Sequence, residues 1–278
     1  MKKQYLEIRV LKWFCIGLLI AGCKQKKNEA RTMPEINKME TSSISIEQDE
    51  GSVLLEKCIR AHGGLDTWKS FEGLEYNLND NGKNVYQLTH LKDRRAYLKS
   101  EKYEVGFDGK VAWVLPDASE ISGNSASFYY NLDFYFIGIP FLLKDPGVNA
   151  IYEGIVEVNE RKYEALKITF GSEVGLTPED VYYLYLDPAT HILQILTYSI
   201  SYFDKESTAI NTAKVYSDYR RTQGLLMPHK MENFEWVDGE LGKSKNHLRG
   251  FNDIRFLNKI PEEGRFEVPN GAIEEVIK

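Results

Sequence analysis

Cysteine is scarce in this chain: among 278 residues there are three, Cys15, Cys23 and Cys58. Exported domains that depend on disulfide bonds need several cysteine pairs, so a disulfide framework is excluded. Cys15 and Cys23 fall in an N-terminal segment with a different role, which leaves Cys58 without a partner for an intramolecular bridge. Cys58 lies on the apolar face of an expected helix, and we predict an inert core thiol there rather than a nucleophile.

A long hydrophobic run is also missing. The N-terminus has several basic residues followed by an apolar stretch over residues 13–21, far shorter than the ~20 residues that span a bilayer. Such a basic start and short apolar run are typical of an export signal. We therefore expect residues 1–22 to be a signal peptide and not an anchor helix.

The end of this signal points to lipid attachment. Small Ala21 and Gly22 precede Cys23, and the pattern resembles the lipobox of bacterial lipoproteins. In that family the equivalent cysteine is acylated and becomes the first residue of the mature protein. The resemblance implies that Cys23 carries lipid and that the protein resides in the cell envelope, as an outer-membrane lipoprotein facing the periplasm or the surface. The alternative is an ordinary cleaved secretory signal, with Cys23 there by chance.

Positive charge is in deficit. The chain has 35 Lys and Arg against 41 Asp and Glu, a formal net charge of −6. Removal of residues 1–22, which carry a net charge of +3, leaves 256 residues with −9. Because Lys and Arg supply most of the non-specific affinity for nucleic acids, no nucleic-acid partner is expected.

Motifs of common enzyme classes are absent as well. Neither His-x-x-x-His nor Cys-x-x-Cys occurs, so no metal site is expected. There is no Gly-x-Ser-x-Gly elbow, phosphate loop or dinucleotide fingerprint, so we expect no cofactor and assign no catalytic residue. Glu262-Glu263 and Glu274-Glu275 indicate solvated surface. His62 is expected at a helix C-terminus, where its charged form would suit the helix dipole.

The mature chain is expected to have two parts. Residues 24–51 are polar and lack aromatics, a composition that cannot bury enough apolar surface to fold. With Cys23 they are predicted to form a lipidated, flexible tether, residues 23–51. Its basic start either touches anionic lipid or is simply solvated. Residues 52–278 contain no obvious linker or repeat, and they are expected to form a single domain.

That domain is predicted to begin with a helix and continue as strands. Leu54, Leu55, Cys58, Ile59 and His62 share one helical face. Ser52 can cap the start of this helix and residues 63–64, both Gly, can end it. A short second turn is expected at 65–68. After that turn, apolar residues recur at every second position, as in residues 166–170 and 192–202. The strands are separated by turn signals at 81–82, 108–109, 187–188 and 238–239, which indicates an antiparallel sheet.

An aromatic-rich segment interrupts the strand pattern. Residues 127–142, SFYYNLDFYFIGIPFL, are predicted to be helical, starting near Ser125 or Ser127 and interrupted before Pro140. Residues 181–186 form a strand that is apolar or aromatic on both faces, so both faces must be covered, one of them by a helix or a ligand. A core filled by side chains is the alternative to a ligand cavity.

Several segments together resemble an uncharacterised family of bacterial, especially Bacteroidetes, envelope lipoproteins, whose fold is similar to the LolA and LolB lipoprotein carriers. The segments are residues 61–68, 107–109 with 112–113, 134–140, 183–188, Tyr219, 224–225 and 227–228. The resemblance implies a mainly β (α+β) fold: a curved antiparallel half-barrel sheet, with an N-terminal helix and a helical segment covering the concave face. It implies an apolar cavity for acyl chains, but no catalytic residue.

Two classes of function remain open. The first is a noncatalytic, membrane-anchored lipoprotein that binds a hydrophobic ligand, a lipid or an acylated partner. The second is an envelope enzyme or accessory subunit with a site built from distant polar residues. A continuous apolar cavity favours the first class, and a polar cleft that gathers His and carboxylates favours the second. Candidate ligand-binding residues for the first class are Trp113, Phe128, Phe134, Phe136, Phe141, Tyr183 and Tyr185.

Overall fold

The computed structural model describes residues 38–276, apart from 173–174, 176, 203 and 205–207, and side chains from Glu50 onward. The expected signal peptide, Cys23 and the first part of the expected tether lie outside the described residues. Residues 39–278 cluster as one compact unit.

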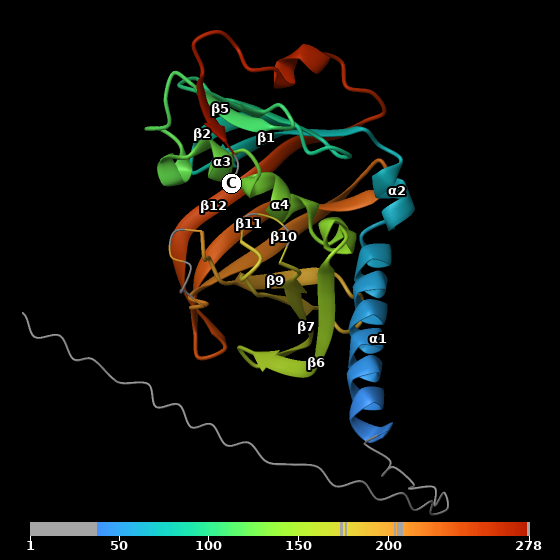
Figure 1. Cartoon of the computed structure of the whole chain (residues 1–278). Helices are drawn as coiled ribbons and strands as arrows, with labels where there is room; N and C mark the ends of the chain where they lie inside the picture. Colours follow the sequence, from blue (N-terminus) through green and yellow to red (C-terminus); the bar gives the residue numbers. More distant parts are fainter. Residues whose placement is uncertain (1–37, 173–174, 176, 203, 205–207, 277–278) are drawn as a thin grey trace, which may run out of the picture. The chain divides into compact units, whose positions relative to one another are not determined.

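The described chain forms one antiparallel sheet of thirteen strands (Figure 1). Neighbours in the sheet are also neighbours in sequence, except where β12 pairs with β1 and β13 pairs with β5. Across the sheet the order is β13-β5-β4-β3-β2-β1-β12-β11-β10-β9-β8-β7-β6. The strands are β1 Gly73–Asp80, β2 Lys83–His90, β3 Ala96–Lys99, β4 Glu104–Phe107, β5 Val111–Leu115, β6 Val148–Val158, β7 Arg161–Phe170, β8 Tyr182–Leu186, β9 Leu193–Tyr198, β10 Thr212–Thr222, β11 Leu225–Val237, β12 Glu240–Leu257 and β13 Ile273–Val276.

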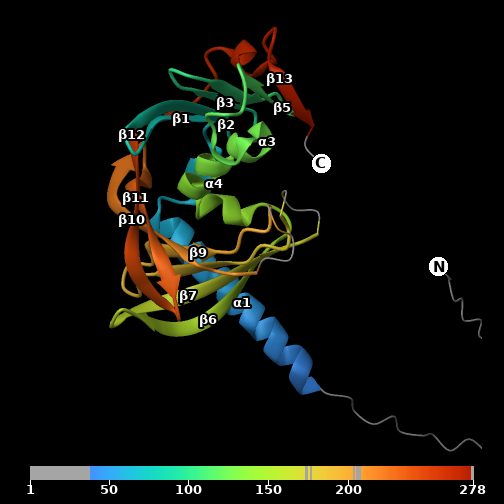
Figure 2. The same cartoon turned by 90° about the vertical axis from the view of Figure 1, so that its left-hand side faces the viewer.

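The helices lie mainly on one side of this curved sheet. Figure 2 shows α3 and α4 in its hollow. The predicted mainly antiparallel β fold, with helices on the concave face, is confirmed. The helical elements are α1 Lys38–Ala61, α2 Leu65–Lys69, η1 Ser122–Asn124, α3 Ala126–Tyr129, α4 Leu132–Gly138, η2 Phe141–Lys144 and η3 Glu263–Phe266.

The N-terminal helix differs from its prediction at one end. Helix α1 begins at Lys38, so Ser52 lies inside it and is not its cap. The predicted C-terminal end is correct, because Gly63 and Gly64 follow with positive φ values of 114° and 92°. Gly51 is in close contact with β6: a Cβ at position 51 would collide with the backbone of Ala150. This part of the helix is therefore packed on the sheet, and the prediction that every residue up to 51 is a free tether is wrong at that point.

One apolar core fills the concave side. It joins the predicted helical face of α1 to the inward residues of the sheet and to α2, α3, α4 and η2. Trp68 of α2 stacks on Phe141, with ring centroids 4.7 Å apart. Cys58 is fully buried, and burial raises the pKa of its thiol well above the usual value. The predicted core position of Cys58 is confirmed.

The convex side carries two smaller clusters. Trp113 belongs to one of them, together with Phe266 of the C-terminal segment. Its indole Nε1 donates a hydrogen bond to the Phe266 carbonyl oxygen at 3.2 Å. Tyr185 belongs to the second cluster and lies 5.3 Å from the Trp236 ring. Aromatic residues therefore cover both faces of the sheet.

Candidate functional site: a cavity between the sheet and the helices

A cavity of about 340 Å³ lies between the concave face of the sheet and helices α3 and α4. Its volume is within the ~300–1,000 Å³ range that is typical of small-molecule sites. One wall comes from the aromatic segment and the other from β7 to β12 with the loops beside them. The aromatic residues that line the cavity are Phe128, Tyr135, Phe136, Phe170, Tyr182, Tyr198 and Tyr202.

The aromatic segment is helical, as predicted, and local hydrogen bonds fix its position. Ser125 caps α3, because its hydroxyl accepts a hydrogen bond from the Phe128 backbone N–H. Glu275 of β13 accepts hydrogen bonds from the backbone N–H groups of Ala126 (2.8 Å) and Ser127 (3.0 Å). At the other end, Tyr216 donates its hydroxyl proton to the Phe136 carbonyl oxygen at 3.1 Å. Glu275 is thus a helix-positioning group, and the prediction that it is only solvated surface is wrong.

A buried ion pair ties α4 to the sheet. Asp133 of α4 lies 2.8 Å from Nε of Arg249 on β12, and the two side chains are 1% and 6% exposed. Gln87 donates to the other carboxylate oxygen of Asp133 at 3.4 Å and accepts a hydrogen bond from the Tyr76 hydroxyl at 2.8 Å. Arg249 also lines the cavity. The ion pair therefore fixes the position of one wall of the cavity relative to the other.

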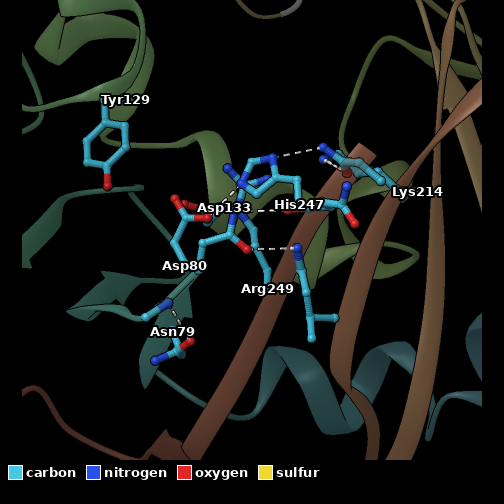
Figure 3. A network of polar contacts seen from close by, with 12 residues as sticks. Asn79, Asp80, Tyr129, Asp133, Lys214, His247 and Arg249 are labelled. Carbon is cyan, nitrogen blue, oxygen red and sulfur yellow. Dashed lines mark hydrogen bonds and ion pairs between the residues drawn. The ribbon is translucent and has the colours of Figure 1, made fainter. Parts of the chain in front are cut away.

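A line of hydrogen-bonded polar side chains crosses four neighbouring strands at the cavity (Figure 3). Lys214 of β10 donates to Asn233 Oδ1 on β11 at 3.0 Å. Asn233 Nδ2 lies 3.1 Å from His247 Nδ1 on β12, and His247 Nε2 lies 2.6 Å from Asp80 on β1. These contacts assign the imidazole proton to Nε2, because an amide N–H must donate to Nδ1. We call these four residues the polar stripe.

Lys214 is the most unusual member of the polar stripe. It is 1% exposed, and its ammonium lies 4.2 Å from the centre of the Phe136 ring and 5.5 Å from that of Tyr198. Burial lowers the pKa of Lys214 to about 7, and the positive charge of Arg249 acts in the same direction. Close to neutral pH this side chain therefore exists both as an amine and as an ammonium ion.

Of the seven predicted ligand-binding rings, two line this cavity, Phe128 and Phe136. Phe134 points into the closed core instead, where it is 1% exposed and packs near Trp68. Phe141 is 2% exposed and stacks on Trp68, and with it borders a separate pocket of about 390 Å³ beside α2.

The other three predicted rings lie on the opposite face of the sheet. Trp113, Tyr183 and Tyr185 belong to the convex clusters, so the prediction that they share one ligand space with the helix aromatics is wrong. Their inward neighbours, such as Tyr182 and Val114, occupy the concave side. The alternation of a strand groups residues by face but does not say which face is concave.

The polar stripe was missed by the sequence analysis. A signal does exist for its lysine and for the neighbouring Arg249. Lys214 points to the same inward face of β10 as buried Tyr216, and Arg249 points to the same inward face of β12 as buried Phe251. A charged residue in the inward register of an otherwise apolar strand is unusual. Its partners lie on other strands, however, and the sequence does not give their pairing.

His62 differs from its prediction. It is 1% exposed, its Nδ1 donates to the Cys58 carbonyl oxygen at 2.8 Å, and burial lowers its pKa to about 4. The residue is therefore neutral at physiological pH, and the expected charge interaction with the helix dipole does not form. Desolvation is stronger than the dipole here because the imidazole packs against Phe141 and Tyr219.

Metal ligands and membrane spans were also sought in the part of the chain that the structure describes. Its His, Cys, Asp and Glu side chains form no group of three or more that could hold a metal ion. None of its helices combines the length and hydrophobicity required to cross a bilayer.

Sequence comparison gives one family match. The model of DUF6503, described as a family of unknown function, matches residues 96–234, which is half of the chain. No curated protein matches the sequence significantly.

Comparison with solved structures finds LolA-superfamily and lipoprotein-sorting domains. An outer membrane lipoprotein-sorting protein domain from Vibrio parahaemolyticus is 11% identical, with a TM-score of 0.50, over 78% of this chain and 97% of that one. A DUF1329 family protein from Desulfovibrio piger is 12% identical (TM-score 0.46; 78% and 97% covered). A LolA superfamily protein from Nitrosomonas europaea is 9% identical (TM-score 0.42; 77% and 96%). At such identities the likeness concerns the fold.

Proposed function

We propose a function from the geometry of this chain, because it belongs to DUF6503, a family of unknown function. In this proposal the protein is a membrane-anchored lipoprotein of the cell envelope, without catalytic activity, that binds a lipid or an acylated partner in its cavity. The observation that carries the proposal is the aromatic-lined space of about 340 Å³ between the concave face of the sheet and helices α3 and α4.

The lining of this cavity suits an acyl chain. Phe128, Phe136 and Phe170 present apolar rings, and the tyrosines beside them contribute mostly ring surface. An alkyl chain gains ~25 cal/mol for each Å² of apolar surface that it removes from water. It has no polar groups that would be left without hydrogen bonds in such a site.

The name of one similar structure agrees with this proposal. The protein from Vibrio parahaemolyticus is described as an outer membrane lipoprotein-sorting protein domain. For the present chain, the proposed envelope location and anchor depend on the expected N-terminal signal and on Cys23. In this proposal, the lipid on Cys23 would keep the cavity close to a membrane. The hydrophobic ligands available beside a membrane are lipids and the acyl chains of other lipoproteins.

The polar stripe gives one reason to consider an enzyme as the second candidate. It joins a lysine and a histidine that line the cavity to the carboxylate of Asp80 behind them, and a buried amine of lowered pKa is the kind of group that catalysis uses. However, both ring nitrogens of His247 are already engaged, by Asn233 and by Asp80. A general base needs a free nitrogen within reach of the substrate, so His247 is better explained as a structural link.

A pair of variants tests the cavity. We expect Phe128→Ala to weaken binding of a fluorescent fatty acid about tenfold, because loss of a ring from the cavity wall removes roughly 1.4 kcal/mol of apolar contact. The matched control is Tyr183→Ala, which removes a half-buried ring from the convex face and should leave the affinity unchanged. Fluorescence titration of both variants gives the comparison. Equal affinities for wild type and Phe128→Ala would contradict binding in this cavity.

The membrane anchor is tested separately. We expect Cys23→Ser to abolish incorporation of labelled palmitate and to move the protein from the membrane fraction to the soluble fraction, because serine offers no thiol for acylation. Cys58→Ser is the control, since the buried Cys58 should not be a lipid site. Persistent palmitate labelling of the Cys23→Ser variant would disprove the lipid assignment.

A further inference from the structure

Lys214 is a buried cation without a carboxylate partner. No carboxylate of the residues that the structure describes lies within 4.0 Å of its Nζ atom. Within the described part of the chain, its hydrogen bond goes to the neutral amide oxygen of Asn233, and the rings of Phe136 and Tyr198 are close neighbours. An ammonium group has three donors, so two of them have no acceptor among the residues that the structure describes.

The second cation of the cavity wall, Arg249, does have a carboxylate partner. Arg249 is compensated by Asp133 at 2.8 Å. The carboxylate of Asp180, which also lines the cavity, is held by the hydroxyl of Ser199 (3.0 Å) and the backbone N–H of Ser201 (2.8 Å). Of the two cations that line the cavity, Lys214 is therefore the one without a carboxylate in contact among the described residues.

The charge of Lys214 does not stabilise the fold. Its pKa falls from 10.5 in the unfolded chain to about 7 in the folded protein, so the unfolded chain binds the proton more tightly. The free energy of unfolding is therefore diminished at every pH below about 10.5, and the full penalty applies below about pH 7. A methionine of similar length would avoid this penalty. A group that destabilises the fold and faces a cavity is typical of a functional site.

We propose that Lys214 binds the anionic head group of an amphiphile, a carboxylate or a phosphate, whose alkyl chain lies among the aromatic rings of the same cavity. The inference rests on the proposed function and adds the polar end of the ligand to it. Asn233 fixes the direction of the ammonium and is itself held by His247. The anion would accept hydrogen bonds from the two remaining donors and supply the missing counter-charge.

The proposed contact makes binding depend on pH. An anion stabilises the charged form of Lys214, so binding is coupled to uptake of a proton when the amine is neutral beforehand. Affinity for a permanently charged anion should fall up to about tenfold per pH unit above the pKa of the free protein. The charged groups that act on Lys214 are Arg249 and Lys245, which oppose its charge, and Asp133 and Asp80, which favour it.

The test measures binding of three decyl probes by calorimetry to the full chain carrying Cys23→Ser. Decanoate and decyl phosphate have anionic head groups, and decanol has the same chain with a neutral one. At pH 6.5 we expect at least one anion to bind about tenfold more tightly than decanol, and this preference should fade by pH 9. Lys214→Met should remove the preference, and Lys214→Arg should retain most of it. Lys230→Met is the control, because Lys230 is exposed on the neighbouring strand.

The outcomes separate this inference from the proposed function. Tight binding of decanoate alone identifies a carboxylate ligand, and tight binding of decyl phosphate alone identifies a phosphate. Equal binding of all three probes to wild type and Lys214→Met would overturn the head-group site and leave the acyl cavity intact. If no probe binds, the proposed function fails as well. If acetate or inorganic phosphate binds as tightly as the decyl anions, the alkyl chain contributes nothing to binding, and the proposal that the ligand is an amphiphile is wrong. A raised midpoint of urea unfolding verifies that Lys214→Met is folded.

Discussion

Replacing Asp133 with alanine is expected to lower the free energy of unfolding by about 3–5 kcal/mol, because it leaves the Arg249 guanidinium buried without a counter-charge. The pair is inaccessible to water, with side chains 1% and 6% exposed, so solvent cannot take the place of the lost carboxylate. Gln87 would lose its acceptor in the same variant. Urea denaturation of the wild-type and variant proteins measures the difference.

Two controls separate the buried charge from the loss of side-chain volume. The double variant Asp133→Leu/Arg249→Met removes both charges and should recover most of the stability, because apolar side chains can replace a buried ion pair with little loss. Glu120→Ala breaks the exposed pair with Lys102 and should change the free energy of unfolding by less than about 1 kcal/mol. A change of similar size in Asp133→Ala and Glu120→Ala would show that the buried pair has no special weight.

Local sequence signals predicted the elements of this fold well. The helical face from Leu54 to His62 depends on the spacing of apolar residues along a single helix, and its end depends on the two glycines that follow, Gly63 and Gly64. The hairpin turns at 81–82, 108–109, 187–188 and 238–239 each join consecutive strands. The helical aromatic segment follows from Ser125 and Pro140 at its two ends. Such features depend on neighbouring residues, so a single sequence contains the information.

The site was predicted less well because it depends on which face of the sheet is concave. Tyr182 and Tyr183 are equally aromatic, yet one lines the cavity and the other packs on the convex side. Gly106 also shows that the role of a residue depends on the face of the sheet. A Cβ at this position would overlap the ring of Trp113 on the paired strand, so the glycine makes room for the indole on the convex face. Curvature arises from the whole sheet, and alternation within one strand does not reveal it.

The polar stripe depends on strand register. Lys214, Asn233 and His247 are separated by 19 and 14 residues along the chain. They meet because β10, β11 and β12 pair with these residues opposite one another. A shift of one residue in either pairing would move the partner to the other face. The site therefore becomes visible only when the strands are aligned.

Phe134 and Phe128 lie in the same aromatic segment, and their alanine variants are expected to give opposite results. Phe134 is 1% exposed and packs beside Trp68, with the Arg94 guanidinium 5.5 Å from its ring centre. Its removal leaves a hole in a closed core, so Phe134→Ala should lower the free energy of unfolding by about 3–5 kcal/mol. Phe128 borders the cavity, so Phe128→Ala should lower it by less than about 2 kcal/mol.

Ligand affinity should follow the reverse order in the same two variants. Phe134 does not line the cavity, so a folded Phe134→Ala protein should bind a fluorescent fatty acid as wild type does, whereas Phe128→Ala should bind it about tenfold more weakly. Urea unfolding and fluorescence titration at low temperature, on the same preparations, give both quantities. If one of the two variants loses both stability and affinity while the other loses neither, the core and the cavity are not separate. Because the two rings are only six positions apart, a general disturbance of the segment cannot produce the crossed result.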